Sequence, residues 1–130
     1  MTTDHSTLLE VLHSGPKRHG QVRTNYAFKD GSNGDVYRAV LLAIGEPPPS
    51  LSIPYADMMQ RIQSVCVGKF PQGSAVEQAC QKISALAQAR HPDQRAALEW
   101  DDQTMNIGDP YFLFYLRSSR KIGQLGSRQV

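Results

Sequence analysis

The segment SAVEQACQKISALAQAR, residues 74 to 90, decides the fold that this sequence predicts. Successive residues placed at intervals of about 100° gather its apolar side chains on one face of a helix. The opposite face carries Ser74, Gln78, Gln81, Ala85 and Gln88, so it is polar and uncharged. We therefore expect one buried and one exposed side, with the helix ending at His91 and Pro92. The predicted buried positions are Val76, Ala79, Cys80, Ile83, Leu86 and Ala87.

A β-hairpin and a further helix are predicted after this segment. Residues 97 to 107, ALEWDDQTMNI, alternate apolar and polar side chains on both sides of a polar bend at 101 to 103. Two alternating runs joined by a short polar bend are typical of a hairpin. Asp109 and Pro110 are the residue types that favour the start of the next helix, which runs through the aromatic stretch that follows.

Two helices and a short strand are predicted before the segment. Asn33 or Asp35 can cap a helix that ends at Gly45, in front of three prolines. Residues 51 to 53 alternate like a strand, and Pro54 suits the first turn of the next helix. The expected buried positions are Val36, Tyr37, Val40, Leu41 and Ile44 in the first helix and Met58, Met59, Ile62, Val65 and Cys66 in the second.

This order of elements resembles an α+β fold, the winged helix-turn-helix domain, over residues 34 to 108. The resemblance implies a three-helix core and a small three-stranded antiparallel sheet, in which the short strand joins a wing hairpin. Residues 106 to 119, NIGDPYFLFYLRSS, are also similar to the end of winged-helix segments C-terminal to the ATPase domain in some bacterial and archaeal AAA and STAND-type ATPases. We expect an arm, partly flexible, at 1–33, the domain with its C-terminal helix at 34–121, and a basic flexible tail at 122–130.

The resemblance implies a regulatory module that binds double-stranded DNA, with residues 74 to 90 as the recognition helix. Its outward side chains Ser74, Gln78, Gln81 and Lys82 are then the ones that reach base edges. Glutamine can make two hydrogen bonds with adenine, and lysine can contact guanine or a phosphate. A polar helix face that is merely hydrated remains the alternative interpretation.

The charges are unevenly distributed along the chain. Lys and Arg number 4, 6 and 4 in residues 1–33, 34–116 and 117–130, against 3, 9 and 0 Asp and Glu. The middle is therefore acidic, and Glu99, Asp101 and Asp102 at the predicted hairpin would be repelled by DNA phosphates. We expect phosphate contacts in the tails instead, although basic tails also serve solubility. These residues are Lys17, Arg18, Arg23, Arg117, Arg120 and Lys121.

The aromatic helix suggests a rival function. Six apolar or aromatic residues in succession, from Tyr111 to Leu116, make that helix apolar on all sides. One face can cover the core while the other needs a second surface, so Tyr111, Phe112, Phe114 and Tyr115 are candidate contacts for a homodimer or a partner protein domain. The alternative is a helix wholly buried within the monomer, with the N-terminal arm as a lid.

Other classes of protein are disfavoured. The chain has 130 residues, enough for one domain, and lacks an apolar run of membrane-spanning length or a signal peptide, so we expect a cytoplasmic location with Cys66 and Cys80 as buried free thiols. The sequence contains no phosphate-binding GxxxxGK[ST] motif and no zinc-like spacing of His and Cys. We expect no enzymatic activity, cofactor or small-molecule substrate. HPD at 91 to 93 is similar to the loop of J-domain cochaperones, but a helix stop accounts for it.

Overall fold

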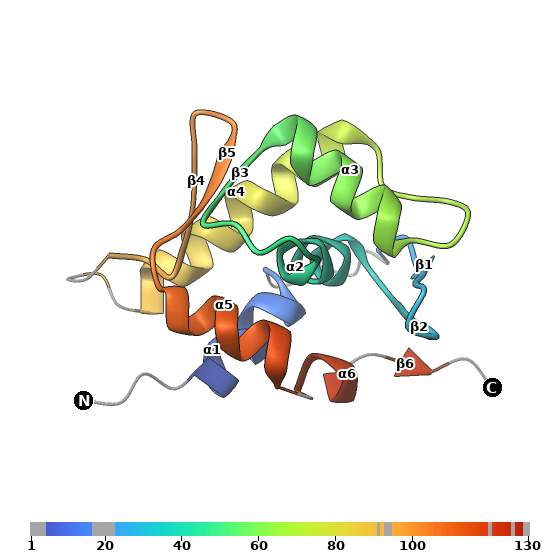
Figure 1. Ribbon diagram of the computed structural model, residues 1–130, viewed down its shortest axis with the longest axis horizontal. Coiled ribbons are helices and arrows are strands. Elements are labelled where there is room, and N and C mark those ends of the chain that lie inside the picture. Colours follow the sequence, from blue (N-terminus) through green and yellow to red (C-terminus); the bar gives the residue numbers. More distant parts are fainter. Residues whose placement is uncertain are drawn as a thin grey trace.

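The protein has a mixed α+β fold, with helices around a central helix α2 and two small antiparallel sheets (Figure 1). The computed structural model describes residues 5–16, 23–90, 92, 95–119, 121–125 and 127–128. Residues 127 and 128 are described by their backbone only. The helices are α1 (His5–Ser14), α2 (Val36–Gly45), α3 (Tyr55–Val65), α4 (Gly73–Arg90), α5 (Pro110–Ser118) and α6 (Lys121–Leu125). The strands are β1 (Tyr26–Ala27), β2 (Ser32–Gly34), β3 (Ser52–Pro54), β4 (Leu98–Asp101), β5 (Thr104–Ile107) and β6 (Ser127–Arg128).

Helix α2 forms the centre of the core. Asp35 caps it, because its Oδ1 accepts hydrogen bonds from the backbone N–H groups of Tyr37 (3.0 Å) and Arg38 (3.2 Å). The sequence left the cap open between Asn33 and Asp35, and the structure assigns it to Asp35. Helices α1, α3, α4 and α5 all pack against α2, so burial extends beyond the predicted apolar stripe, of which Val36 is half-buried and the other four residues are buried. The buried residues are Tyr37, Arg38, Ala39, Val40, Leu41, Ala43 and Ile44.

The predicted hairpin and its third strand form one sheet in the order β3-β5-β4. Ile53 of β3 lies opposite Met105 of β5, and Leu98 of β4 lies opposite Ile107 on the other side. All four side chains are buried, which fixes the register because a slip by one residue would expose them. Asp102 and Gln103 make the turn with φ of 51° and 54°, as a two-residue hairpin requires.

Helices α3 and α4 follow the predicted burial pattern closely. The predicted core positions of α4 are buried, except that Leu86 is half-buried, and those of α3 are buried except Met59, also half-buried. The two helices approach closely where α4 begins. A Cβ on Gly73 would lie 2.0 Å from the hydroxyl oxygen of Tyr55, so a larger residue there would require the Tyr55 side chain to shift.

The described parts of the two chain ends pack on the core. In α1, which the sequence placed in the arm, Leu8, Leu9 and Leu12 are buried, and Gly15 ends the helix with a φ of 71°. Strand β2 pairs with β1 on one side and with β6 on the other, so the second sheet joins segments from both ends of the chain. The sequence did not predict this sheet or α6.

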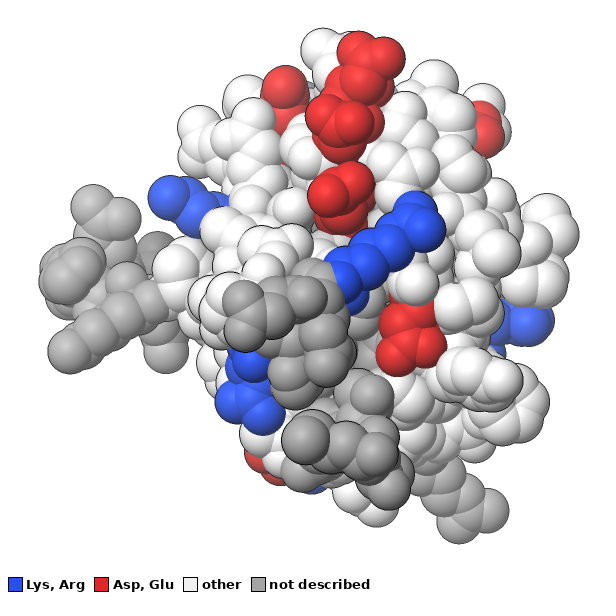
Figure 2. Space-filling model, turned by 90° about the vertical axis from the view of Figure 1, so that its left-hand side faces the viewer, with Lys and Arg blue, Asp and Glu red and all other residues white. Residues whose placement is uncertain are grey.

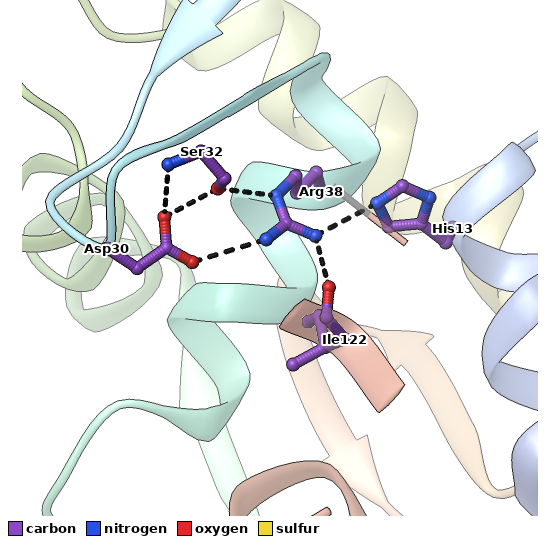
Figure 3. Close-up of polar contacts among 5 residues, drawn as sticks. All are labelled: His13, Asp30, Ser32, Arg38 and Ile122. Carbon is purple, nitrogen blue, oxygen red and sulfur yellow. Dashed lines mark hydrogen bonds and ion pairs between the residues drawn. The ribbon is translucent and has the colours of Figure 1, made fainter. Parts of the chain in front are cut away.

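A buried arginine links these segments (Figure 3). The Arg38 side chain has no solvent exposure and donates hydrogen bonds to Asp30 Oδ2 (3.2 Å), Ser32 Oγ (3.0 Å) and the carbonyl oxygen of Ile122 in α6 (2.7 Å). Its Nη1 also lies 3.2 Å from Nε2 of His13 in α1. One guanidinium group therefore holds α1, the β1–β2 turn and α6 against α2.

The two cysteines are free and buried, as predicted. Burial raises the pKa of Cys66 to about 11, and burial together with the Glu77 carboxylate raises the pKa of Cys80 to about 12. Thiols with such pKa values are poor nucleophiles near neutral pH, so neither is a reactive group. No helix in the described part of the chain is long and apolar enough to cross a membrane.

Candidate functional site

The outward face of α4 carries the residues predicted to contact bases. Ser74, Gln78, Gln81 and Lys82 are all exposed, whereas the opposite face of the helix is buried against the core. Helix α4 also packs along strand β4, so its orientation is fixed from two sides. The structure therefore brings the four predicted residues together on one rigid, accessible surface, which we call the α4 face.

Lys82 is exposed on the α4 face, and three further exposed cations lie near the helix in the sequence, one of which, Lys69, has its Nζ 5.7 Å from the ring centroid of Tyr26 in β1. Lys69 precedes the helix, Lys82 lies in its middle, Arg90 is its last residue and Arg95 follows in the next loop. Only Lys82 was predicted as a contact, since the sequence analysis looked for phosphate-binding residues in the tails.

The hairpin beside α4 is acidic. Glu99, Asp101 and Asp102 are exposed on it. Figure 2 shows acidic side chains in a column in the upper part of the molecule, on the side that carries the hairpin in Figure 1. Since these carboxylates would repel a phosphate backbone, the hairpin is not suited to grip DNA as the wing of many winged-helix proteins does.

The cations expected to bind phosphates from the tails have intramolecular partners where the structure describes them. Lys121 forms an ion pair with Glu10 (Nζ to Oε1, 2.6 Å), and Arg117 donates through Nε to the carbonyl oxygen of Gly45 (3.3 Å). Arg23 pairs with Asp35 at 3.1 Å. These contacts hold the chain ends in place, which reduces their availability for phosphates. Lys17, Arg18 and Arg120 lie outside the described residues.

Helix α5 divides the predicted interaction residues into two groups. Phe112 has 0% exposure and belongs to the core, so it is not available to a partner, contrary to the expectation from the sequence. Tyr111 and Phe114 are 76% and 71% exposed. Tyr115 is half-buried, and its ring lies 5.7 Å from that of His5 in α1. The α1 helix therefore covers one flank of α5, and Tyr111 and Phe114 stay in solvent.

The start of α5 is fixed by the predicted cap. Asp109 Oδ1 accepts a hydrogen bond from the Tyr111 backbone N–H (3.0 Å), and its Oδ2 lies 3.0 Å from His5 Nε2. Pro110 follows in the first turn, where its missing N–H is no loss. These contacts tie the N-terminal ends of α1 and α5 together and set which side of α5 faces water.

A polar hollow of about 240 Å³ is lined by residues whose charged side chains form ion pairs or hydrogen bonds within the protein. Arg23 and Asp35 form an ion pair across it, and His13 contacts Arg38. Burial and the neighbouring Arg38 charge lower the pKa of His13. Among the described residues, no group of three or more His, Cys, Asp or Glu side chains could hold a metal ion.

No protein-family model, curated protein or solved structure matches the chain. Inference about function therefore depends on the α4 face, the acidic hairpin and the exposed rings of α5.

Proposed function

We propose that the chain is a non-catalytic winged helix-turn-helix module that binds duplex DNA through the α4 face. The exposed row of Ser74, Gln78, Gln81 and Lys82 on a rigidly held helix is the observation that carries the proposal. We also propose the narrower relationship to the winged-helix segments of ATPases, on the sequence that leads from β5 into α5.

The order of elements supports the assignment of the fold. Helices α2, α3 and α4 with strands β3, β4 and β5 follow one another as in a winged-helix domain, and β3 joins the hairpin in an antiparallel sheet. In that fold α4 takes the position of the recognition helix, and the β4–β5 hairpin takes that of the wing.

The dimensions and chemistry of α4 suit a major groove. Its 18 residues span about 27 Å, and a groove about 12 Å wide admits one α-helix. A glutamine that makes two hydrogen bonds with adenine contributes about 1–3 kcal/mol of discrimination between bases. Lys82, exposed on the α4 face, can neutralise a phosphate beside the groove.

The acidic hairpin limits the geometry of binding. Docking is favourable when α4 enters the groove and the hairpin remains away from the backbone, because Asp101 and Asp102 would otherwise meet phosphates. The balance of charge also predicts modest affinity and strong dependence on salt.

The test is the affinity of the protein for mixed-sequence and adenine-rich duplexes, measured by fluorescence anisotropy. Gln78→Ala combined with Gln81→Ala should weaken the preferred duplex at least tenfold, since about 1.4 kcal/mol corresponds to a factor of ten. The matched control is Gln60→Ala with Gln63→Ala, which removes two exposed amides from α3 and should change affinity by less than about twofold. Equal affinity of wild type and the α4 variant would remove α4 from recognition.

A second candidate function is docking onto a protein surface through α5. The exposure of Tyr111 and Phe114, at 76% and 71%, is the observation that favours it. Large aromatic side chains in solvent are common at sites of association, where they later become buried.

A further inference from the structure

Helix α1 carries a histidine near each end, and the two histidines face groups of opposite charge. At the N-terminal end, Nε2 of His5 lies 3.0 Å from Oδ2 of Asp109. At the C-terminal end, Nε2 of His13 lies 3.2 Å from Nη1 of Arg38. Protonation of an imidazole therefore acts in opposite directions at the two ends of this helix.

The contact between His13 and Arg38 requires a neutral imidazole ring. An arginine has no acceptor, so Nε2 of His13 accepts the hydrogen bond. A protonated ring has a donor on both nitrogens, and its charge then lies beside a guanidinium group that has no solvent exposure. Asp30, which pairs with Arg38, lies on the opposite side of the guanidinium group from His13 (Figure 3). Acid therefore replaces a hydrogen bond by repulsion between two cations.

The other charged groups around α1 do not reverse this effect. Burial and Arg38 lower the pKa of His13, and the opposing influence of Asp35 is smaller. The two oxygens of Asp35 already serve the α2 cap and the ion pair with Arg23. Helices α4, α5 and α6 also pack against α1, and their buried or paired ionisable groups interact with partners other than His13, namely Glu77 with Cys80, Asp109 with His5 and Lys121 with Glu10.

The contact at the other end of α1 gains from acid. A protonated His5 adds a positive charge beside the Asp109 carboxylate, which makes their hydrogen bond a charge-assisted one. Asp109 is itself held in place, because its Oδ1 caps α5 at the backbone N–H of Tyr111. The first turn of α1 therefore keeps its attachment to α5 when the pH falls.

We propose that α1 contains an acid-sensitive switch, in which protonation of His13 makes residues 12–15 open from the core more often and leaves the first turn attached to α5. The switch is a property of the fold, and the inference is independent of DNA binding.

Two contacts that do not titrate limit the extent of opening. Leu12 has 0% exposure, and its burial favours the closed helix at any pH. Arg23 donates to the carbonyl oxygens of Ser14 (2.7 Å) and Pro16 (2.5 Å) and keeps its charge throughout this range. Acid should therefore raise the frequency of opening while the closed form remains the major population.

Amide hydrogen exchange of the intact protein, followed by NMR, tests the proposal. After correction for the intrinsic rate at each pH, protection of the amides of residues 13–15 should fall by up to about tenfold per pH unit below pH 6.5. The Gly15 amide reports this directly, because it donates to the carbonyl oxygen of Val11 (3.1 Å). Exchange at these amides should not depend on low concentrations of urea, since a local opening exposes little surface. The amides of α2 should instead depend on urea.

Two glutamine variants identify the histidine that is responsible. His13→Gln keeps an oxygen that can accept from Arg38 but does not titrate, so protection of Gly15 should no longer change with pH. His5→Gln is the matched control, because it removes the other imidazole of α1 and should retain the fall. Constant protection in the wild type, exchange of Gly15 with the urea dependence of α2, or a fall that persists in His13→Gln would overturn the proposal.

Discussion

Helices α4 and α5 both have one buried and one exposed side. The exposed side of α4 carries amides that water can solvate, whereas that of α5 carries large aromatic rings. The amides of Gln78 and Gln81 hydrogen-bond to solvent, so hydration alone accounts for their position. The rings of Tyr111 and Phe114 gain nothing comparable, and burial of such a side chain stabilises a structure by roughly 1.5–3 kcal/mol. The difference teaches that hydration alone accounts for the exposed side of α4, whereas the rings of α5 would gain free energy from burial, which is why docking through α5 is the second candidate function.

The two sides of α5 provide the largest expected effect. Phe112→Ala should lower the free energy of unfolding by about 3–5 kcal/mol, because Phe112 is fully buried. Phe114→Ala, two residues away, should change it by no more than about 0.5 kcal/mol, because the Phe114 side chain is exposed. Urea unfolding followed by circular dichroism measures both. Equal losses for the two variants would mean that Phe114 is part of the core and that the comparison fails.

The next largest effect concerns the buried Arg38 and the hydrogen bonds that hold the two chain ends against α2. Arg38→Met should cost about 2–4 kcal/mol, because Asp30, Ser32 and the Ile122 carbonyl lose a buried donor. Arg117→Met, which alters an exposed arginine, is the matched control and should cost less than about 1 kcal/mol. Limited proteolysis should then cut the Arg38 variant first within α1 or α6. Protection equal to that of wild type would show that the two ends are held by other contacts.

A smaller effect separates the α4 face from the hairpin beside it. Asp101→Asn with Asp102→Asn should raise affinity for duplex DNA severalfold at low salt, since two repelling charges disappear. The fold should persist because asparagine tolerates the positive φ of position 102, which is 51°. A drop in DNA affinity would mean that the carboxylates contact a partner directly.

The smallest effect is a dependence of stability on pH. Arg38 only donates, so Nε2 of His13 must accept, and the folded ring is neutral with its proton on Nδ1. Burial and Arg38 lower the pKa of His13 below its ordinary 6.5, so the unfolded chain binds the proton more readily. The contribution of His13 to the free energy of unfolding should be fully present above pH 6.5. It should decrease as the pH falls toward the lowered pKa, by at most about 1.4 kcal/mol per pH unit. His13→Gln should flatten this slope in urea titrations, and an identical slope would assign it to other groups.

Much of the fold around α4 could be predicted because local signals agree there. The positions of Ile83, Asp109 and the 101–103 bend follow from periodicity, cap chemistry and turn composition, which depend on near neighbours in the chain. For the same reason the exposed residues of the α4 face were predicted correctly as exposed. The assignment of Phe112 failed because a helix that is apolar on all sides does not reveal which side the core will cover.

The role of Arg38 could not be predicted, because its partners lie up to 84 residues away in the sequence. Strands β1, β2 and β6 are two or three residues long, too short for an alternating pattern to emerge. The segment from Ser32 to Gly34 therefore reads as part of a turn, although pairing with β1 and β6 makes it a strand. Likewise, the intramolecular partners of Lys121 and Arg117 became apparent only when the chain ends were placed.

The most direct test of DNA recognition by α4 is a salt titration of duplex binding by the wild type and by Lys82→Gln. The logarithm of the binding constant should fall linearly with the logarithm of salt concentration, with a slope of roughly −0.9 for each phosphate neutralised. Lys82 is a described cation on the α4 face, so the account predicts that the slope becomes less steep by about one in the variant. Identical slopes for the two proteins, or no binding even at low salt, would contradict it.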